Sequence, residues 1–284
     1  MKKLRALANA IKLEHTIFSL PFALASLLLL VEKLPSLREF FLIILALILA
    51  RTAGMAFNRW LDYDIDKKNP RTQNWAHIKG ELPLGWIKTL AIISSLTFIG
   101  VSYLLGKLAF ILSPIVVFLL WFYPLAKRVT YFPHFVLGFV YFLIPIAVDV
   151  ALNQRISPLA VVLGLAMATW VAGFDILYAL QDYHFDQTYG VKSLPVKLGI
   201  KNSLRVARFL HLLTLLFLLL VGNLHPKMGA IYFAGLTAIA GFLVYEHLLI
   251  KPGDLSRINK AFFTVNGWIS IVYFLIVLTD YFIF

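Results

Sequence analysis

Long apolar segments alternate with polar connections along almost the whole chain. The pattern predicts nine helices, at about residues 15–31, 37–61, 86–105, 108–127, 133–152, 158–182, 203–222, 226–249 and 260–282. A helix crosses a hydrocarbon core about 30 Å thick with about 20 apolar residues, since each residue adds about 1.5 Å. The two long connections, 62–85 and 183–202, are polar, and no soluble domain or linker interrupts the pattern. The sequence therefore predicts an all-α polytopic membrane protein with a single domain, 1–284.

Composition supports this prediction and excludes several kinds of site. Of the 284 residues, 61% are hydrophobic and 14% are charged, whereas a soluble domain is roughly half apolar and a quarter charged. The chain has no cysteine, which excludes disulfides and cysteine-based zinc sites. Glu32 and Lys33 follow the first apolar run without a small-residue cleavage pattern, so we expect no cleavable signal peptide.

The formal net charge of +12 would also suit a nucleic-acid-binding protein, but the placement of the basic residues indicates a membrane topology. Most of the 26 lysines and arginines fall in the ends and connections that share one side with the N-terminus. Such a bias predicts a cytoplasmic N-terminus and an outer C-terminus in the cell inner (plasma) membrane. We therefore expect the lipid bilayer, and no nucleic acid, as a partner. The pattern does not specify an oligomeric state.

The second predicted helix ends in an acidic motif. Asn58, Asp62 and Asp66 are spaced by four residues, so they share one helical face where the helix meets a polar connection. Asp64 lies off this face, and we expect it to be solvated.

The sixth predicted helix ends in a second motif with the same spacing. Its members are Tyr178, Asp182 and Asp186, and each acid lies 120 residues after its counterpart in the first motif. Both sites read Asp-Tyr-x-x-Asp. The repetition suggests two related halves whose acidic sites face each other across a bundle.

The chemistry of these motifs favours a metal ion. Clustered carboxylates at a membrane are costly, and a cation relieves both their desolvation and their repulsion. Carboxylate and amide oxygens suit Mg²⁺, which commonly bridges protein carboxylates to substrate phosphates. The alternative, ordinary helix-end charges, is adequate for one acid but less so for two motifs of identical spacing. We therefore predict a magnesium–diphosphate site whose ligands are Asn58, Asp62, Asp66, Asp182 and Asp186.

The two motifs resemble the signatures of the UbiA prenyltransferase superfamily. Further matching stretches occur in the order expected for that family: Asn69-Pro-Arg-Thr72, Glu81-Leu-Pro-Leu-Gly85, Tyr123-Pro-Leu-Ala-Lys-Arg128, Asp175 and Gly190-Val-Lys-Ser193. The segments 15–22 and 174–182 are similar to the 4-hydroxybenzoate polyprenyltransferase branch, including forms from menaquinone synthesis.

The resemblance implies a fold and an activity. The fold would be a UbiA-type bundle of nine transmembrane helices with its active site on the cytoplasmic side. The enzyme would be a magnesium-dependent aromatic prenyltransferase that moves a polyprenyl group from polyprenyl diphosphate to a small aromatic acceptor, 4-hydroxybenzoate, in ubiquinone or menaquinone biosynthesis. Ionisation of the diphosphate would be followed by electrophilic substitution on the ring. The resemblance places Tyr178 near the forming cation and Asp175 near the reaction centre, as catalytic residues.

Five basic residues are candidates for substrate binding. Arg51 lies deep in the second predicted helix, seven residues before Asn58 and on nearly the same face, so it needs a diphosphate, an acceptor carboxylate or a structural acid as its partner. The resemblance implies that the 62–85 connection forms a lid with Arg71 facing phosphate. The diphosphate site would be completed by Lys127, Arg128 and Lys192, for which anchoring at the membrane surface is the alternative.

Some polar residues and some functions remain alternatives. We expect His77 to be solvated in its polar connection, and we expect Lys12 and Glu14 to anchor the first helix at the interface rather than reach the acceptor. A UbiA-type transferase could instead use dihydroxynaphthoate, homogentisate, haem, a chlorophyll precursor or a glycerolipid. A transporter is the alternative from another class, although transporters place their sites near the membrane midplane. A scaffold without chemistry leaves the repeated motifs unexplained.

Overall fold

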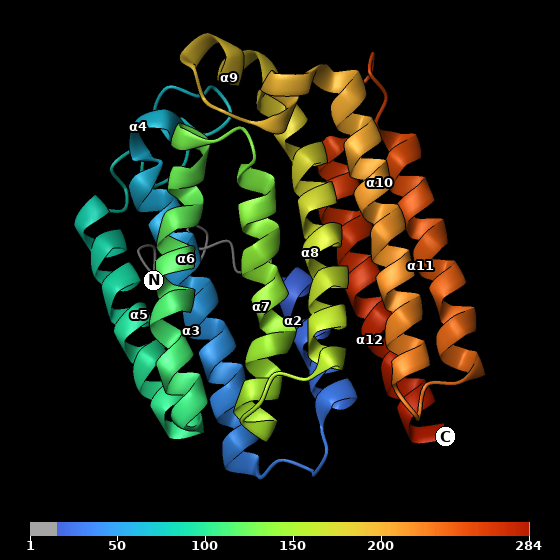
Figure 1. Cartoon of the computed structure of the whole chain (residues 1–284). Coiled ribbons are helices and arrows are strands. Elements are labelled where there is room, and N and C mark those ends of the chain that lie inside the picture. Colours follow the sequence, from blue (N-terminus) through green and yellow to red (C-terminus); the bar gives the residue numbers. More distant parts are fainter. Residues whose placement is uncertain (1–15, 284) are drawn as a thin grey trace.

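The computed structural model describes residues 16–283, which form a bundle of helices joined by turns and loops (Figure 1). Within these residues there is no β-strand, only an isolated bridge between Lys251 and Asp254. The expected anchoring by Lys12 and Glu14 lies outside the described residues. The α-helices are α2 (Thr16–Leu30), α3 (Leu37–Leu61), α4 (Tyr63–Asp66), α5 (Leu84–Leu105), α6 (Lys107–Val129), α7 (Pro133–Asn153), α8 (Pro158–Ala179), α9 (Tyr183–Tyr189), α10 (Leu194–Leu224), α11 (Ala230–Leu249) and α12 (Asn266–Ile283).

Eight helical segments of the described chain are long and apolar enough to cross a membrane. The first apolar segment is shorter, with 12 residues in Ser19–Leu30, so a ninth crossing stays a prediction. Large apolar side chains such as Leu96, Leu212 and Leu248 are exposed on the outside of the bundle, where they would contact lipid. These features describe an integral membrane protein, as expected from the hydropathy pattern.

The helix boundaries follow local signals in the sequence. Ser36 and Glu39 form a capping box that begins α3, in which each side chain binds the backbone of the other residue. Ser157 caps α8, and Pro158 occupies its first turn. These signals explain why the second and sixth predicted helices begin where the sequence indicated.

The expectation that 183–202 only connects two helices is wrong, because most of that polar segment is itself helical. It contains α9 and the beginning of α10, separated by Gly190 in a left-handed conformation. Inside α10, Gly199 breaks the helix with φ of 75°, which a glycine adopts without steric cost. The prediction followed hydropathy, whereas Pro195 in the first turn lets a helix begin among polar residues.

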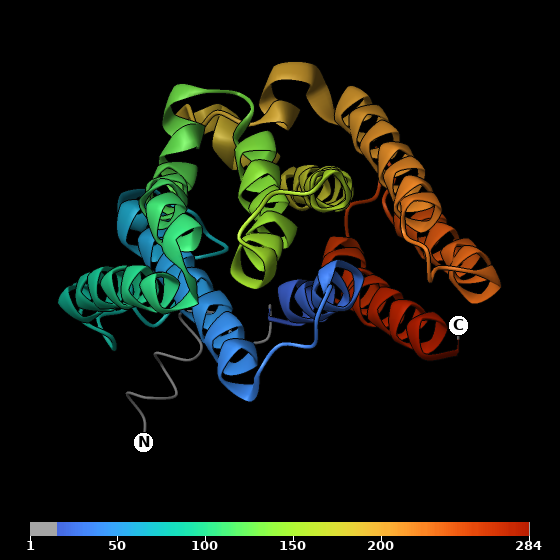
Figure 2. The same cartoon turned by 60° about the horizontal axis from the view of Figure 1, so that its bottom comes forward.

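Helix α8 is held tightly between α7 and α10. A Cβ on Gly164 would lie 2.7 Å from the backbone oxygen of Phe142, and one on Gly173 would lie 2.3 Å from His211 Nε2. Small residues at such positions allow helices to approach closely within a membrane. Figure 2 shows α2 between α7 and α12, against which it packs. The tight packing gives α8 a fixed position from which to present polar side chains.

The segment before α12 is a π-helical turn, Lys260–Val265. Asn266 stabilises it, because its Nδ2 donates to the Ala261 carbonyl at 3.2 Å and to Glu246 Oε1 at 2.6 Å. The Asn266 Oδ1 accepts from Trp170 Nε1 at 2.8 Å. All these contacts are buried, so they connect α8, α11 and α12 inside the bundle.

Candidate functional site

The two acidic motifs share a backbone conformation as well as a sequence. Asp62 lies between α3 and α4 with φ of −94° and ψ of 1°, and Asp182 lies before α9 with φ of −97° and ψ of 5°. This sparsely populated region often holds residues of active sites. Helices α4 and α9 lie at the same end of the bundle, at the top of Figure 1, which we call the motif side. The first aspartates of the two motifs therefore share a local backbone conformation.

A cavity of about 610 Å³ extends from the motif side into the bundle. The acids of both motifs line one end of it. The lining then becomes apolar and reaches Leu105 at the end of α5 and Ile156 before α8, on the opposite side of the bundle. This shape suits an elongated ligand with a charged head and an apolar tail.

In the first motif, Asp62 is buried and only partly neutralised. Asn58 Nδ2 donates to Asp62 Oδ2 at 2.8 Å, and the Lys127 ammonium lies 2.7 Å from the same oxygen. The Asp62 Oδ1 is buried without a hydrogen-bond partner among the described residues. Burial raises the pKa of the Asp62 carboxyl, and the charge of Lys127 opposes this shift.

The second acid of the first motif, Asp66, lies against residues that follow it in the 62–85 connection. Arg59 Nη1 lies 3.9 Å from Asp66 Oδ2, and the Arg59 guanidinium lies 3.9 Å from the ring centre of Trp75. His77 is 2% exposed and lies 3.8 Å from the same carboxylate oxygen, so the expectation of a solvated histidine is wrong. The connection folds back over the motif because Leu82 anchors it in the core, fully buried.

The same connection joins the first motif to the second. Arg71 contacts Asp182 with two bonds, from Nε to Oδ1 at 3.0 Å and from Nη2 to Oδ2 at 2.6 Å. Asn69 also donates to Asp182 Oδ1 at 2.8 Å, and Arg71 Nη1 donates to the Tyr178 hydroxyl at 3.1 Å. Burial on its own would lower the pKa of Arg71, but its bonds and its attraction to Asp182 raise the pKa overall.

The acids fit a magnesium ion that shares its coordination with a phosphate. Asp62 Oδ1 and Asp66 Oδ2 are buried acceptors without hydrogen-bond partners in the described chain, and both are hard oxygen ligands. No three His, Cys, Asp or Glu side chains of residues 16–283 converge on one metal position. Magnesium usually takes one or two protein carboxylates and completes its shell with phosphates and water. The amide oxygen of Asn58 accepts from Arg59 Nη1 at 3.0 Å, so the protein already engages it.

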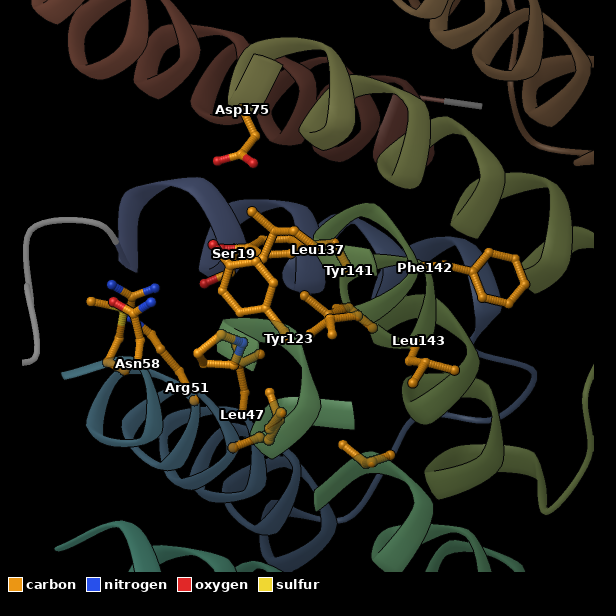
Figure 3. A pocket seen from close by; sticks show the side chains of 18 of the residues that line it. Ser19, Leu47, Arg51, Asn58, Tyr123, Leu137, Tyr141, Phe142, Leu143 and Asp175 are labelled. Atoms are coloured by element: carbon orange, nitrogen blue, oxygen red, sulfur yellow. The ribbon is translucent and has the colours of Figure 1, made fainter. Parts of the chain in front are cut away.

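Polar side chains also line the cavity below the acids (Figure 3). Asp175 extends from α8 toward the space beside Tyr123, while Arg51 lies next to Asn58 on α3. The Arg51 guanidinium interacts with the Tyr141 hydroxyl. An arginine, two phenols and a carboxylate thus border one part of a mostly apolar chamber.

Tyr178 lies between the two parts of the cavity. Its ring centre is 4.1 Å from that of Phe262 and 5.4 Å from the Arg71 guanidinium. The tyrosine is therefore packed inside the site. Its ring forms part of the wall just below the acids.

Four of the five predicted basic residues line the cavity: Arg51, Arg71, Lys127 and Lys192. The backbone N–H of Lys192 donates to the Lys127 carbonyl at 2.9 Å, which joins the segment after the second motif to the end of α6. The fifth, Arg128, does not line the cavity. It pairs with the exposed Asp64 at 2.6 Å and donates to the Leu61 carbonyl at 2.6 Å, so Asp64 is ion-paired rather than merely solvated.

The cavity-lining residues that were not predicted from the sequence include four with charged or ionisable side chains, Arg59, Tyr123, His134 and Tyr141. Arg59 stands inside the first motif, and Tyr123 opens a stretch that resembles the family, so both had a signal. His134 is bonded to Asp175, with Nδ1 and Oδ2 2.7 Å apart. A single histidine after Pro133 gives no spacing pattern, and only the fold brings it to Asp175.

Comparison with known proteins gives one consistent result. Residues 19–269 match the model of the UbiA prenyltransferase family. A 4-hydroxybenzoate octaprenyltransferase of Aliivibrio fischeri is 32% identical over 247 residues, covering 85% of this chain and 84% of that protein. The enzyme of the same name from Pseudomonas aeruginosa is 30% identical over 258 residues, covering 90% of this chain and 86% of that protein.

Solved structures agree with the sequence comparisons. A UbiA homolog from Aeropyrum pernix K1 has a TM-score of 0.84 and 30% identity, covering 94% of this chain and 98% of that one. A UbiA homolog from Archaeoglobus fulgidus, solved with GPP and Mg²⁺, has a TM-score of 0.72 and 15% identity, covering 97% and 99%, and shares the fold. The family inferred from the two acidic motifs is confirmed, and the chain belongs to the UbiA prenyltransferase family.

Proposed function

We propose that this intramembrane prenyltransferase moves a polyprenyl group from polyprenyl diphosphate to 4-hydroxybenzoate, with magnesium, in quinone biosynthesis. The observation that carries the proposal is the cavity, which has paired acidic motifs at one end, a long apolar chamber, and Arg51 and Asp175 between them. Two relatives with about 30% identity bear the name of this reaction. We assign the whole chain, 1–284, to one catalytic domain.

The acidic end of the cavity would hold the diphosphate. We assign the magnesium ligands to Asp62, Asp66, Asp182 and Asp186, with Asn58 orienting Asp62. The homolog from Archaeoglobus fulgidus that binds GPP and Mg²⁺ supports this choice of metal and donor. When bound, magnesium neutralises the diphosphate as the allylic C–O bond breaks. Lys127 and Arg71 place further positive charge beside the same acids, and Arg71 would exchange part of its contact with Asp182 for a phosphate. Lys192 lines the same cavity with its Nζ donating to the Val129 carbonyl at 3.3 Å, and it would bind the diphosphate by leaving that carbonyl.

The inner part of the cavity would hold the acceptor. Arg51 suits a carboxylate because its guanidinium can form two parallel hydrogen bonds. Asp175 would hold the phenolic hydroxyl and accept the proton released when the ring is alkylated ortho to that hydroxyl. Tyr178 presents an aromatic ring next to the acids, where the allylic cation forms and where a ring face stabilises positive charge.

Product formation by the purified protein tests the function. We expect protein in detergent, supplied with magnesium and geranyl diphosphate, to prenylate 4-hydroxybenzoate, and mass spectrometry should detect the product. Chelation with EDTA should abolish the product, and added Mg²⁺ should restore it. Prenylation of only another acceptor, such as dihydroxynaphthoate or homogentisate, would retain the reaction class and overturn the acceptor. No product from any acceptor, with long and short donors and with folded protein, would overturn the function.

We further propose that the motif side faces the cytoplasm, with the N-terminus inside and the C-terminus outside. Most basic residues of the described chain lie on the motif side, as the positive-inside rule requires. The chain has no cysteine, so single substitutions can report each side. We expect a membrane-impermeant maleimide to label Lys227→Cys in spheroplasts, and Asp254→Cys only in inverted vesicles. The reverse labelling would contradict the orientation.

A further inference from the structure

His134 occupies a position that connects three helices beside the cavity. It lies in the first turn of α7 and is 3% exposed. Its Nδ1 lies 2.7 Å from Asp175 Oδ2 on α8, and its Nε2 accepts a hydrogen bond from the backbone N–H of Leu194 at 3.3 Å. Leu194 is the first residue of α10, where backbone N–H groups have no partner within the helix.

The Leu194 contact determines where the imidazole carries its proton. A backbone N–H is always a donor, so Nε2 must present its lone pair to it. A neutral imidazole then carries its proton on Nδ1, the nitrogen that faces Asp175. His134 therefore donates a hydrogen bond to the Asp175 carboxylate through Nδ1. It is also the one side-chain hydrogen-bond partner of Asp175 within residues 16–283.

We propose that His134 is a positioning residue for Asp175 and thereby for the acceptor. This inference rests on the proposed function. By binding Oδ2, His134 fixes the rotation of the carboxylate and leaves the other oxygen for the acceptor hydroxyl. The proton that leaves the acceptor would go to Asp175, while His134 keeps its own proton on Nδ1 throughout.

The same histidine relates the acceptor end of the cavity to the second acidic motif. Lys192 and Ser193 line the cavity directly before Leu194, and the Lys192 backbone is bonded to the end of α6. The imidazole of His134 therefore fixes the position of Asp175 relative to the segment that contains Lys192 and Ser193. Asp175 also lies on the tightly packed α8, so the arrangement is rigid at both ends.

Two kinds of variant separate positioning from a merely structural role. His134→Phe keeps an aromatic ring at this position and removes both hydrogen bonds. His134→Leu also removes both hydrogen bonds, and it replaces His134→Phe if the latter does not fold. His134→Gln can accept from Leu194 and donate to Asp175. With 4-hydroxybenzoate and geranyl diphosphate, we expect kcat to fall by about 10- to 100-fold in the removal variants, which is the usual loss when a residue that orients a functional side chain is removed. The KM for geranyl diphosphate should change less than about twofold, and His134→Gln should recover most of kcat.

A double-mutant cycle gives the decisive comparison. If His134 acts through Asp175, His134→Phe should cause no further loss of kcat in an Asp175→Asn background. Equal losses in both backgrounds would overturn the proposal, and so would failure of His134→Gln to recover kcat in folded protein. A rise in the donor KM with unchanged kcat would assign His134 to the cap of α10 alone. An inactive wild-type protein would instead refute the proposed function, which distinguishes the two failures.

Discussion

Asp62→Asn is expected to lower kcat for prenyl transfer by about 100-fold or more while the protein stays folded. The carboxylate is 2% exposed, and its Oδ1 has no hydrogen-bond partner among the described residues, so its charge is available to a metal ion. Loss of one group that stabilises developing charge typically costs about 10²- to 10³-fold. Initial rates at saturating Mg²⁺, with the product quantified by mass spectrometry, measure the effect.

Asp64→Asn is the matched control. It makes the same chemical change two residues away, in a side chain that is exposed and paired with Arg128 outside the cavity. We expect its rate to stay within about twofold of wild type. Magnesium with diphosphate should raise the melting temperature of the wild type and of Asp64→Asn, because both bind the folded state, but not that of Asp62→Asn. Equal activity of the two variants would remove Asp62 from the metal site.

Arg51→Gln is expected to lower kcat/KM for 4-hydroxybenzoate by about 100-fold. A hydrogen-bonded charge pair inside a protein costs about 2–5 kcal/mol when one partner is truncated. The variant should use the methyl ester of 4-hydroxybenzoate about as well as the wild type does, because the ester has no carboxylate charge. Steady-state kinetics with both acceptors therefore give a ratio that is insensitive to small losses of folded protein.

Arg51→Lys tests the same contact more finely. Lysine keeps the charge but cannot form two parallel bonds to a carboxylate. We therefore expect the kcat/KM of Arg51→Lys for 4-hydroxybenzoate to lie between that of the wild type and that of Arg51→Gln. If Arg51→Gln impaired both acceptors equally and raised the KM for the donor, Arg51 would belong to the diphosphate end. That outcome would leave the magnesium site unchanged and would reassign only this arginine.

Hydropathy predicted most of the membrane-spanning helices because it is a local feature of the sequence. The expected second helix, 37–61, coincides with α3, since a serine cap begins it and the motif ends it. The beginning of α10 was missed because its first turns are polar. Its conformation there depends on Pro195 in the first turn and on Gly199, and no continuous apolar segment marks it in the sequence. Hydropathy therefore predicts where the chain crosses the membrane better than it predicts the helices that lie at the surface.

The acidic motifs were identifiable for the same reason, because spacing along one helix is visible in the sequence. The surroundings of the motifs depend on the tertiary fold. His77 appeared solvated but is buried against Asp66, since Leu82 pulls its connection into the core. Arg128 and Lys127 are neighbours in the sequence, yet they face different sides, and only Lys127 reaches the acids.

The π-helical turn before α12 makes one wall of the cavity depend on the length of the backbone. This turn holds Phe262 against Tyr178, with ring centres 4.1 Å apart. Deleting one residue from 260–261 would let the segment relax to an α-helix, and each residue of register turns a helix by about 100°. Phe262 would then leave Tyr178, although no side chain at the wall had been replaced. A one-residue change of length, almost invisible in a hydropathy profile, could therefore redesign the space available to the prenyl chain as effectively as a substitution inside it.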